Sequence, residues 1–459
     1  MKFYLIQNYS EESKITVNHR TMIYKIYFIT LLLFTNQLIA QNPISPPGLY
    51  IADPTARVWE DGKLYIYGSL DESCDYYCSR KHHALSTEDL INWTIHENIF
   101  SSAGENDQLS YNDNLLFAPS IAYKDGLYYL YYCQPDKEHA EGLAISKSPI
   151  GPFMDGQYMD IGKYNEIDPD VFIDDDGVAY YCWGQFSLKM ARLNPDMKTL
   201  DTTTIIDNVL TETEHHFHEG AFMLKIRGLY YLIFADISRA DAPTCLGYAT
   251  SDKPLGPYEY RGVIIDNNRC NPNNWNNHGS IAAYNGQYYV FYHRSTNACN
   301  KMRKACLEPI EILDDGTIPE VEMTSQGADP PLSAFSNIEA EWACLLFGNA
   351  RINEFENKKE CISGISNNDK IAFKYIDFKS GANSLNLRIR SGNTAGKLVV
   401  SLDKPWHSRL ALINIEPGIE GEWSTISLPV KKVSGVHALW LHFYSKENGK
   451  IEIDWINFE

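Results

Sequence analysis

The sequence predicts an all-β chain, in which a five-bladed β-propeller is followed by a β-sandwich of the jelly-roll type. Three observations carry this prediction. One pattern of an apolar strand, a Gly-centred turn and a Tyr-rich strand recurs five times between residues 50 and 300. The copies follow one another at the spacing of propeller blades. From about residue 337 the pattern changes to short strands of alternating apolar and polar residues, separated by Gly, Ser, Asn and Pro. This pattern is typical of a sandwich.

Each copy of the repeat reads as a β-hairpin. The turn glycines lie 51 to 64 residues apart, and one hairpin per period of this size indicates one blade. We therefore expect a propeller catalytic domain over residues 45–325. The five copies span residues 52–69, 118–133, 168–184, 219–236 and 278–293.

The residue that opens each copy is a candidate functional residue. A propeller places the first strand of each blade at the central axis, so the opening positions should converge on one mouth of the channel. Three acids meeting there would shift one another's pKa values, which suggests acid/base chemistry. For a single copy, a strand-end cap is the competing explanation, but three acids in register favour a site. The opening residues are Asp53, Ala118, Asp168, Glu219 and His278.

Residues 1–40 are predicted to be a signal peptide with an N-terminal extension. Met22 begins an apolar stretch that carries Lys25 near its start and ends at Ala40, as secretory signals do. Cleavage near Ala40 predicts a secreted or periplasmic protein whose mature chain has no membrane span. A retained membrane anchor is the alternative.

The charge of the chain restricts its partners. The net charge is −19 at pH 7, and such a chain repels nucleic acid phosphates and anionic membranes. A neutral substrate suits it better. The 30 Tyr and 9 Trp fit both blade packing and a sugar-binding cleft, where aromatic rings stack on the apolar faces of sugars. We expect a monomer that binds no nucleic acid.

The cysteines and a histidine cluster raise two further questions. Ten cysteines form an even set, compatible with disulfides after export. Cys74 and Cys78 have no second ligand pair in register, which argues against zinc. His215, His216 and His218 stand close to Glu219 without a regular ligand spacing, so lining of a substrate pocket is the favoured role.

The C-terminal part is expected to be a separate domain. Residues 326–336 are rich in turn formers, including Asp329-Pro330-Pro331, and are predicted to be a linker. Residues 337–459 hold strands without a helical period and are predicted to form the sandwich.

The openings of the five copies resemble glycoside hydrolase family 43. The match runs over about residues 45–325, and the ordered set is more specific than any single tripeptide. The resemblance implies a five-bladed propeller that hydrolyses glycosidic bonds with inversion of configuration. The matching motifs are Ala52-Asp53-Pro54, Phe117-Ala118-Pro119, Ile167-Asp168-Pro169, His218-Glu219-Gly220 and Asn277-His278-Gly279-Ser280.

The resemblance also implies a role for each matched position. Asp53 corresponds to the general base, Glu219 to the general acid, and Asp168 to the carboxylate that orients the acid and raises its pKa. His278 matches a channel histidine that holds a water or a calcium ion, and Arg294 a substrate-contacting arginine. Phe117 remains a stacking platform, but Ser120 stands where many members have Asp.

The C-terminal domain resembles carbohydrate-binding module family 6. Ile338-Glu339-Ala340-Glu341 and Ile453-Asp454-Trp455 match the two ends of that family. The resemblance implies a structural Ca²⁺ held by Glu339, Glu341 and Asp454, since oxygen-only ligands suit this ion. Phe373 and Trp423 fall where the family has sugar-sandwiching aromatics. Lys370 and Glu452 depart from the pattern, so a purely structural sandwich is the alternative.

Together these features predict a secreted, inverting exo-glycosidase that acts on plant cell-wall pentose polysaccharides or oligosaccharides. An α-L-arabinofuranosidase and a β-xylosidase are equally compatible with the sequence. An exo-β-galactanase and a non-catalytic glycan-binding propeller are the alternatives. We expect calcium in a structural role and no cofactor for the chemistry.

Overall fold

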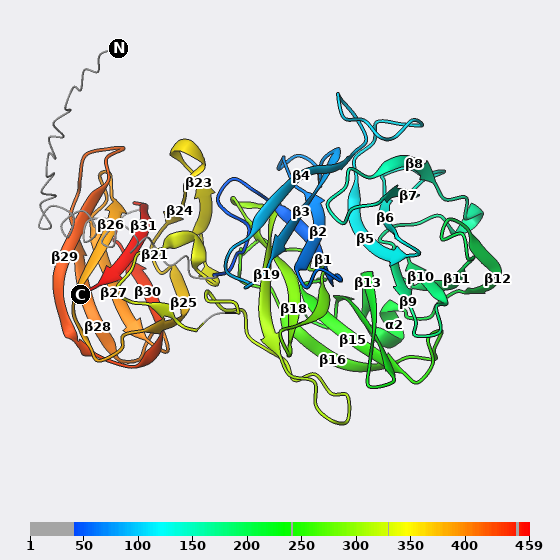
Figure 1. Ribbon diagram of the computed structural model, residues 1–459. Coiled ribbons are helices and arrows are strands. Elements are labelled where there is room, and N and C mark those ends of the chain that lie inside the picture. The colour runs from blue at the N-terminus through cyan, green and yellow to red at the C-terminus, as the bar shows by residue number, and fades with distance from the viewer. Residues whose placement is uncertain (1–40, 240–241, 329, 447–448) are drawn as a thin grey trace, which may run out of the picture. The chain divides into compact units, whose positions relative to one another are not determined.

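The computed structural model describes residues 41–239, 242–328, 330–446 and 449–459 (Figure 1). The predicted signal peptide with its extension, residues 1–40, lies outside the described residues. The regular secondary structure of the described part is almost entirely β-strand, as predicted, with one short helix, α2 (Glu212–His215), and 3₁₀ turns at Gly162–Tyr164, Ala340–Trp342 and Glu356–Lys358. Among the described residues no helix is long and apolar enough to cross a bilayer.

The N-terminal part of the described chain forms five antiparallel sheets, one after another in sequence. The first holds β1 (Ile51–Val58), β2 (Leu64–Leu70), β3 (Lys81–Thr87) and β4 (Thr94–Ser101). The second holds β5 (Phe117–Lys124), β6 (Leu127–Cys133), β7 (Glu141–Ser146) and β8 (Met154–Tyr158). The third holds β9 (Asp170–Ile173), β10 (Ala179–Trp183), β11 (Lys189–Leu193) and β12 (Leu200–Ile206). The fourth holds β13 (Phe217–Ile226), β14 (Leu229–Asp236), β15 (Cys245–Ser251) and β16 (Glu259–Asp266), and the fifth holds β17 (Ser280–Tyr284), β18 (Gln287–Thr296) and β19 (Cys299–Ile310).

The sequence repeat corresponds to the first two strands of each sheet. In each copy these strands pair across the predicted turn. The turn glycines, from Gly62 to Gly286, all have φ between 76° and 83°, a conformation that glycine adopts without steric cost. The local turn chemistry therefore specifies the five hairpins.

Apolar clusters between neighbouring sheets join them into a ring. The Tyr-rich second strands supply much of this packing, and Tyr67, Tyr131 and Tyr181 are fully buried. One cluster joins Ile51 and Leu64 of the first sheet to Phe291 and Leu307 of the fifth. Since the other four clusters fill the spaces between successive sheets, the five sheets close into a propeller.

The first strands of the blades are irregular where they reach the channel mouth. The pairing register shifts between Ala52 and Thr55 in β1, and between Phe117 and Ser120 in β5. Strand β13 shifts register on both sides of Glu219. A bulge changes the direction of the side chain at which it occurs. At these shifts the side chains therefore no longer alternate regularly between the two faces of the sheet.

The C-terminal part forms two six-stranded sheets, as expected for a sandwich. The first sheet holds β20 (Leu332–Ser333), β22 (Leu345–Phe347), β25 (Lys370–Asp377), β27 (Gly396–Leu402), β28 (Arg409–Ile415) and β30 (Val436–Tyr444). The second holds β21 (Ile338–Glu339), β23 (Arg351–Glu354), β24 (Glu360–Ile365), β26 (Ala382–Arg390), β29 (Ser424–Val433) and β31 (Ile451–Phe458). Strand β20 lies inside the segment predicted as a linker, so the sandwich begins earlier than residue 337.

Propeller and sandwich belong to one compact unit, Ala40–Glu459. Lys304 of β19 forms an ion pair of 2.7 Å with Glu360 of β24, and both side chains are at most 2% exposed. The backbone N–H of Leu346 donates to the carbonyl of Arg269, and Cys344 packs in the apolar cluster between the fourth and fifth blades. The contact between the two domains is therefore partly buried and specific.

Candidate active site

Four of the five opening residues line one cavity. Asp53, Asp168, Glu219 and His278 surround a space of about 240 Å³ together with Phe117. The first four residues come from four different blades, as the repeat predicts. Phe117 comes from the remaining blade. Gly220 allows the His278 ring to lie close to the backbone of β13, because a Cβ at residue 220 would lie 2.9 Å from that ring. The mouth of the propeller thus gathers three carboxyl groups and an imidazole.

Asp53 is held as a carboxylate. Arg303 Nη1 lies 2.8 Å from its Oδ1, and the Ser69 hydroxyl donates to its Oδ2 at 2.7 Å. Burial alone would raise the pKa of Asp53, but Arg303, with His278 and His293, outweighs burial and lowers this pKa to about 2. Asp53 is therefore ionised at any physiological pH and available to accept a proton.

Asp168 has the opposite electrostatic environment. Its carboxyl is buried and lies near the carboxylates of Glu219 and Asp53, so burial first and these charges second raise its pKa well above the ordinary value. His278 Nδ1 lies 4.0 Å from Asp168 and 3.6 Å from Asp53. The cavity therefore separates the pKa values of two neighbouring carboxyl groups, which is how enzymes assign acid and base roles.

Glu219 faces the cavity from the bulged part of β13. The Gln185 side-chain amide donates to its Oε2 at 2.7 Å. The Glu219 side chain is half-buried and lines the cavity, so its second oxygen, Oε1, is available to a bound ligand. A carboxyl group in this position can give a proton to a bound leaving group.

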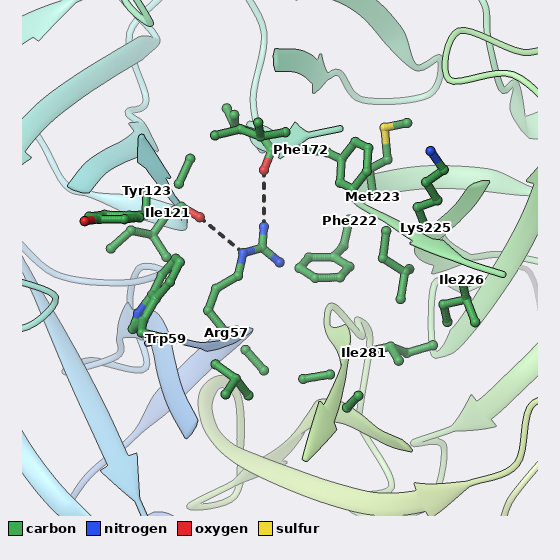
Figure 2. Close-up of a pocket in the computed structure, with 18 of the residues that line it drawn as sticks. Arg57, Trp59, Ile121, Tyr123, Phe172, Phe222, Met223, Lys225, Ile226 and Ile281 are labelled. Atoms are coloured by element: carbon green, nitrogen blue, oxygen red, sulfur yellow. Dashed lines mark hydrogen bonds between the residues drawn. The ribbon is translucent and has the colours of Figure 1, made fainter. Parts of the chain in front are cut away.

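A second cavity occupies the other end of the same first strands. It measures about 420 Å³ and is lined mainly by apolar side chains, with Arg57 and Lys225 as its charged residues. Figure 2 shows the Arg57 guanidinium at its centre, hydrogen-bonded to the backbone oxygens of Ile121 and Val171, with the Phe222 ring beside it. Because no carboxyl group of the described residues lines this larger cavity, the smaller one is the candidate active site.

Several cavity residues lie outside the repeated hairpins, and the sequence prediction missed them. Arg303 comes from β19, and Gln185 directly follows the third copy. Tyr77 and Cys78 come from the loop between β2 and β3, and Trp275 from the loop before β17. The indole of Trp275 is 46% exposed, so this ring and Phe117 offer apolar surface to a sugar. Trp275 stands three residues before His278, which is the one signal that points to it.

The arginine predicted to contact substrate does not line the cavity. Arg294 is 3% exposed, donates to the Tyr292 hydroxyl and lies 3.7 Å from Glu308, inside the fifth blade. Arg303 occupies the cavity instead. Of the three clustered histidines only His218 lines the cavity, where its Nδ1 bonds Glu212 at 2.7 Å.

The two aromatic residues predicted to bind glycan on the sandwich do not form one site. Phe373 of β25 is fully buried in one sheet, so it offers no ring to a sugar. Trp423 stands at the start of β29 in the other sheet, half-buried against Phe355, and Arg390 lies 4.7 Å from its ring centre. The prediction that Phe373 and Trp423 bind one sugar between them is therefore wrong, because the alternation of side chains along β25 turns Phe373 into the core.

The predicted calcium ligands have mixed surroundings. Burial and the carboxylates of Glu360 and Glu339 raise the pKa of Glu341 to about 8, and one Glu341 oxygen is buried without a hydrogen-bond partner. Asp454 is instead paired with Arg388 at 2.7 Å. Among the described residues no group of three or more His, Cys, Asp or Glu side chains is arranged to hold a metal ion. His278, predicted as a further metal ligand, belongs to no such group either.

Comparison with known protein families gives two matches that divide the chain. The model of the glycosyl hydrolases family 43 matches residues 40–318. The model of the carbohydrate binding module (family 6) matches residues 349–459. The first range contains the five sheets, and the second contains the sandwich except for its short strands β20, β21 and β22.

Individual relatives resemble the chain over all or part of its length. A xylosidase/arabinosidase of Thermoclostridium stercorarium is 30% identical over 471 residues, covering 88% of this chain and 95% of the relative. An arabinoxylan arabinofuranohydrolase of Bacillus subtilis, solved in complex with cellotetraose, is 25% identical with a TM-score of 0.53 and covers 91% of this chain and 97% of its own. A β-xylosidase/α-arabinofuranosidase from a compost metagenome, solved with xylotriose in a calcium-free form, is 29% identical with a TM-score of 0.52 and covers 62% of this chain and 97% of its own.

Proposed function

The chain belongs to the glycosyl hydrolases of family 43, and from this membership we propose that it is an exported, inverting exo-glycosidase that removes terminal pentoses from arabinoxylan or its oligosaccharides. The observation that carries the proposal is the set of Asp53, Asp168 and Glu219 around one small cavity. A lectin needs no carboxyl groups with separated pKa values. A hydrolase needs one to activate water and one to protonate the leaving oxygen.

The roles follow from the environment of each carboxyl group. Asp53, whose pKa is lowered to about 2, takes the proton of the attacking water. Glu219, bonded to the Gln185 amide, protonates the glycosidic oxygen as the bond to the sugar breaks. Asp168, with its pKa raised by burial and by the nearby Glu219 and Asp53 carboxylates, orients Glu219 without adding a full negative charge beside Asp53. The water oxygen ends on the sugar, and the proton from Glu219 ends on the released alcohol.

The size and lining of the cavity support a terminal sugar as the substrate. The volume of about 240 Å³ is below the range of pockets that hold drug-sized ligands, so it accommodates one sugar ring. Trp275 and Phe117 border this ring position. The relatives that align over both domains are named xylosidase/arabinosidase and arabinoxylan arabinofuranohydrolase, which favours an L-arabinofuranosyl or D-xylosyl group.

Hydrolysis of two aryl glycosides tests the activity. We expect release of p-nitrophenol from the α-L-arabinofuranoside, the β-xyloside or both. Asp53→Asn and Glu219→Gln should each lower kcat by about 10²–10⁴-fold or more, with an unchanged circular dichroism spectrum. Asp125→Asn, in the exposed turn of the second blade, is the control and should retain full activity. Binding of arabinoxylan without hydrolysis would replace the enzyme with a glycan-binding propeller.

We also propose that the sandwich holds a structural Ca²⁺ at Glu339 and Glu341, with Asp454 nearby. The support is the buried, unpartnered oxygen of Glu341 in a cluster of like charges, because carboxylate oxygens are the ligands that this ion prefers. Added Ca²⁺ should raise the thermal midpoint of the protein but not of Glu341→Gln. Glu420→Gln, at an exposed position, should respond as the parent does. Equal midpoints with Ca²⁺ and with a chelator would contradict the site.

A further inference from the structure

An exposed aromatic residue stands beside the proposed acid of the candidate active site. Phe186 lies in the turn between β10 and β11, directly after Gln185, whose side-chain amide donates to Glu219. The φ of Phe186 is 65°, a left-handed conformation that a bulky residue adopts only at a cost. Phe186 is 53% exposed, so burial of the ring offsets little of this cost.

The backbone of Phe186 is held from two sides. Its N–H donates to the carbonyl of His218 at 2.6 Å, and its carbonyl accepts from the N–H of Glu212 at 3.2 Å. Gly184 permits the tight turn before it, because a Cβ at residue 184 would collide with the carbonyl oxygen of Ser187. The turn therefore fixes the position of an exposed ring, and such preorganisation favours binding.

The ring of Phe186 extends the wall of the cavity outward. The His218 side chain lines the cavity, whereas Phe186 does not. The two rings meet edge to face, with their centres 5.2 Å apart, so Phe186 stands at the rim next to His218. Glu212 bonds to His218 Nδ1 at 2.7 Å, and Nε2 is therefore the nitrogen that can bond to a hydroxyl group of a ligand.

We propose that Phe186 and His218 form the leaving-group subsite, in which the sugar released from the terminal residue stacks on the Phe186 ring. The inference rests on the proposed function, because the stereochemistry of that reaction fixes the side at which the leaving group departs. In an inverting hydrolysis the base and the acid act on opposite faces of the terminal sugar. With Asp53 as the base, the glycosidic oxygen points to Glu219, and the sugar that carries this oxygen lies on the Glu219 side of the cavity.

The chemistry of the leaving-group subsite suits a neutral sugar ring. The apolar face of a sugar fits an aromatic ring, and the hydroxyl groups at the edge of the sugar fit the His218 imidazole. A sugar acid fits less well, because the Glu212 carboxyl group beside His218 would place a like charge next to it. A xylose unit of arabinoxylan or its oligosaccharides, without an acidic substituent, meets both requirements.

The backbone conformation argues against the alternative that Phe186 is an ordinary surface residue. Single exposed apolar residues are common and need no explanation. At a φ of 65°, however, Gly or Asn would avoid most of the backbone cost. A Phe with an exposed ring at this position is therefore accounted for by a ligand that covers the ring.

Calorimetric titration of a hydrolytically impaired variant tests the subsite without turnover. In the full-length Glu219→Gln variant, the further change Phe186→Ala should raise the Kd of xylotriose by about 3–10-fold. Phe186→Tyr should keep the original Kd. Phe335→Ala is the matched control, because Phe335 is 43% exposed and does not line the cavity. A binding site on the sandwich would add a second Kd that is the same in all variants, and an unchanged first Kd in Phe186→Ala would overturn the proposal.

The thermal midpoint separates binding from a structural role of the ring. Phe186→Asn, in the same Glu219→Gln variant, should raise the midpoint, because Asn adopts a positive φ at a lower cost. It should nevertheless weaken xylotriose binding as Phe186→Ala does. A lower midpoint together with weaker binding would mean that the ring braces its own turn, and this result would overturn the proposal.

The parent chain separates failure of the subsite from failure of the proposed function. Hydrolysis of an aryl glycoside by the parent, with an unchanged Kd of xylotriose in Phe186→Ala, would overturn the leaving-group subsite alone. Absence of hydrolysis by the parent would overturn the proposed function, and with it the assignment of this surface to a leaving group.

Discussion

Asp53 owes its charge to neighbours that come from other parts of the chain. Arg303 lies 250 residues further along the sequence, and Ser69 belongs to the second strand of the same blade. Without Arg303, burial would dominate and favour the protonated carboxyl group. The charge of Asp53, on which its proposed role as the base depends, is therefore set by an ion pair that no short motif contains.

We predict that Arg303→Gln moves the acid limb of the kcat/KM profile to higher pH. Asp53 has a lowered pKa of about 2, so in the parent it loses its charge only near pH 2. In the variant the carboxyl group becomes protonated at a higher pH and activity is lost earlier on acidification. Ser69→Ala removes one hydrogen bond to the same carboxylate and should give a smaller shift in the same direction. A profile whose acid limb stays in place in both variants would contradict the role of Asp53 as the base.

The same ion pair contributes to stability in a defined pH range. The pKa of Asp53 is lowered from 3.8 in the folded chain. Its carboxylate therefore stabilises the fold above about pH 4, and this contribution is lost as the pH falls through about 2. Because the acid limb of the parent falls within this range, a circular dichroism spectrum at each pH must show a folded protein before loss of activity is taken to report protonation.

The sequence does not show which arginine of the last hairpin faces the cavity, and strand register explains why. Arg294 of β18 pairs with Lys304 of β19, and Ser295 pairs with Arg303. Paired residues share a face of the sheet, and successive residues alternate between faces. Arg294 and Arg303 consequently lie on opposite faces, and only the register decides which of them reaches Asp53.

At the scale of the element, the opening residues leave the regular strand geometry: β1, β5 and β13 shift register there, and Asp168 and His278 precede their strands. Asp53, Ala118 and Asp168 all have positive φ, at 52°, 32° and 62°. L-residues adopt this conformation only at a cost, and three blades share it at the same position. The cavity geometry is thus a property of the strand ends, which is why aligned openings of the repeat predict it.

Gly220 is the element-scale position with the clearest steric test. We predict that Gly220→Ala lowers both the thermal midpoint and the activity, because its Cβ would lie 2.9 Å from the His278 ring. Gly228→Ala is the matched control, since Gly228 also has positive φ but a methyl group added there would meet no atom within 4 Å. Both variants carry the backbone cost of a positive φ, so the difference between them measures the collision. Equal loss of activity in the two variants would mean that the His278 side chain moves away from the added methyl group without further loss of activity.

Much of the fold and part of the site follow from sequence, and the division has a physical basis. Hairpins depend on turn glycines and strand alternation within about 18 residues, so the five copies predict the blades. Asp53, Asp168 and Glu219 belong to these copies and are predicted with them. Arg303, Gln185 and Trp275 come from segments without a repeated pattern. The prediction for Phe373 is wrong because the residues alone do not show which strand face is inward.

At the scale of the whole molecule, the sandwich supports the propeller through a buried ion pair. Residues Lys304 and Glu360 belong to different domains, and each is at most 2% exposed. The Tyr50 hydroxyl also bonds to Glu360 at 3.3 Å. Sequence alone suggests that the propeller is independent of residues 337–459. These contacts indicate instead that removal of the sandwich exposes a charged and apolar face of the propeller.

We predict that Glu360→Gln lowers the free energy of unfolding by about 3–5 kcal/mol, because it leaves the Lys304 ammonium buried without a countercharge. The matched control is Glu88→Gln, which breaks the exposed pair between Lys63 and Glu88 and should cost within about 1 kcal/mol. Chemical denaturation of both variants measures the two values. Similar small losses in both would show that the domains are only loosely joined, and truncation near residue 335 would then leave hydrolysis of aryl glycosides intact.

The closure of the ring has a consequence for how the protein is made. The first blade is completed early in synthesis, but the backbone of Ala56 finds its partner, the Ser280 hydroxyl, 224 residues later. At roughly 5–20 residues per second, this partner follows after about 10–45 s. During that time the apolar flank of the first blade has nothing to cover it, and contacts between distant segments also form slowly. The nascent chain is therefore most exposed to aggregation through the flank of its first blade until the last blade is synthesised.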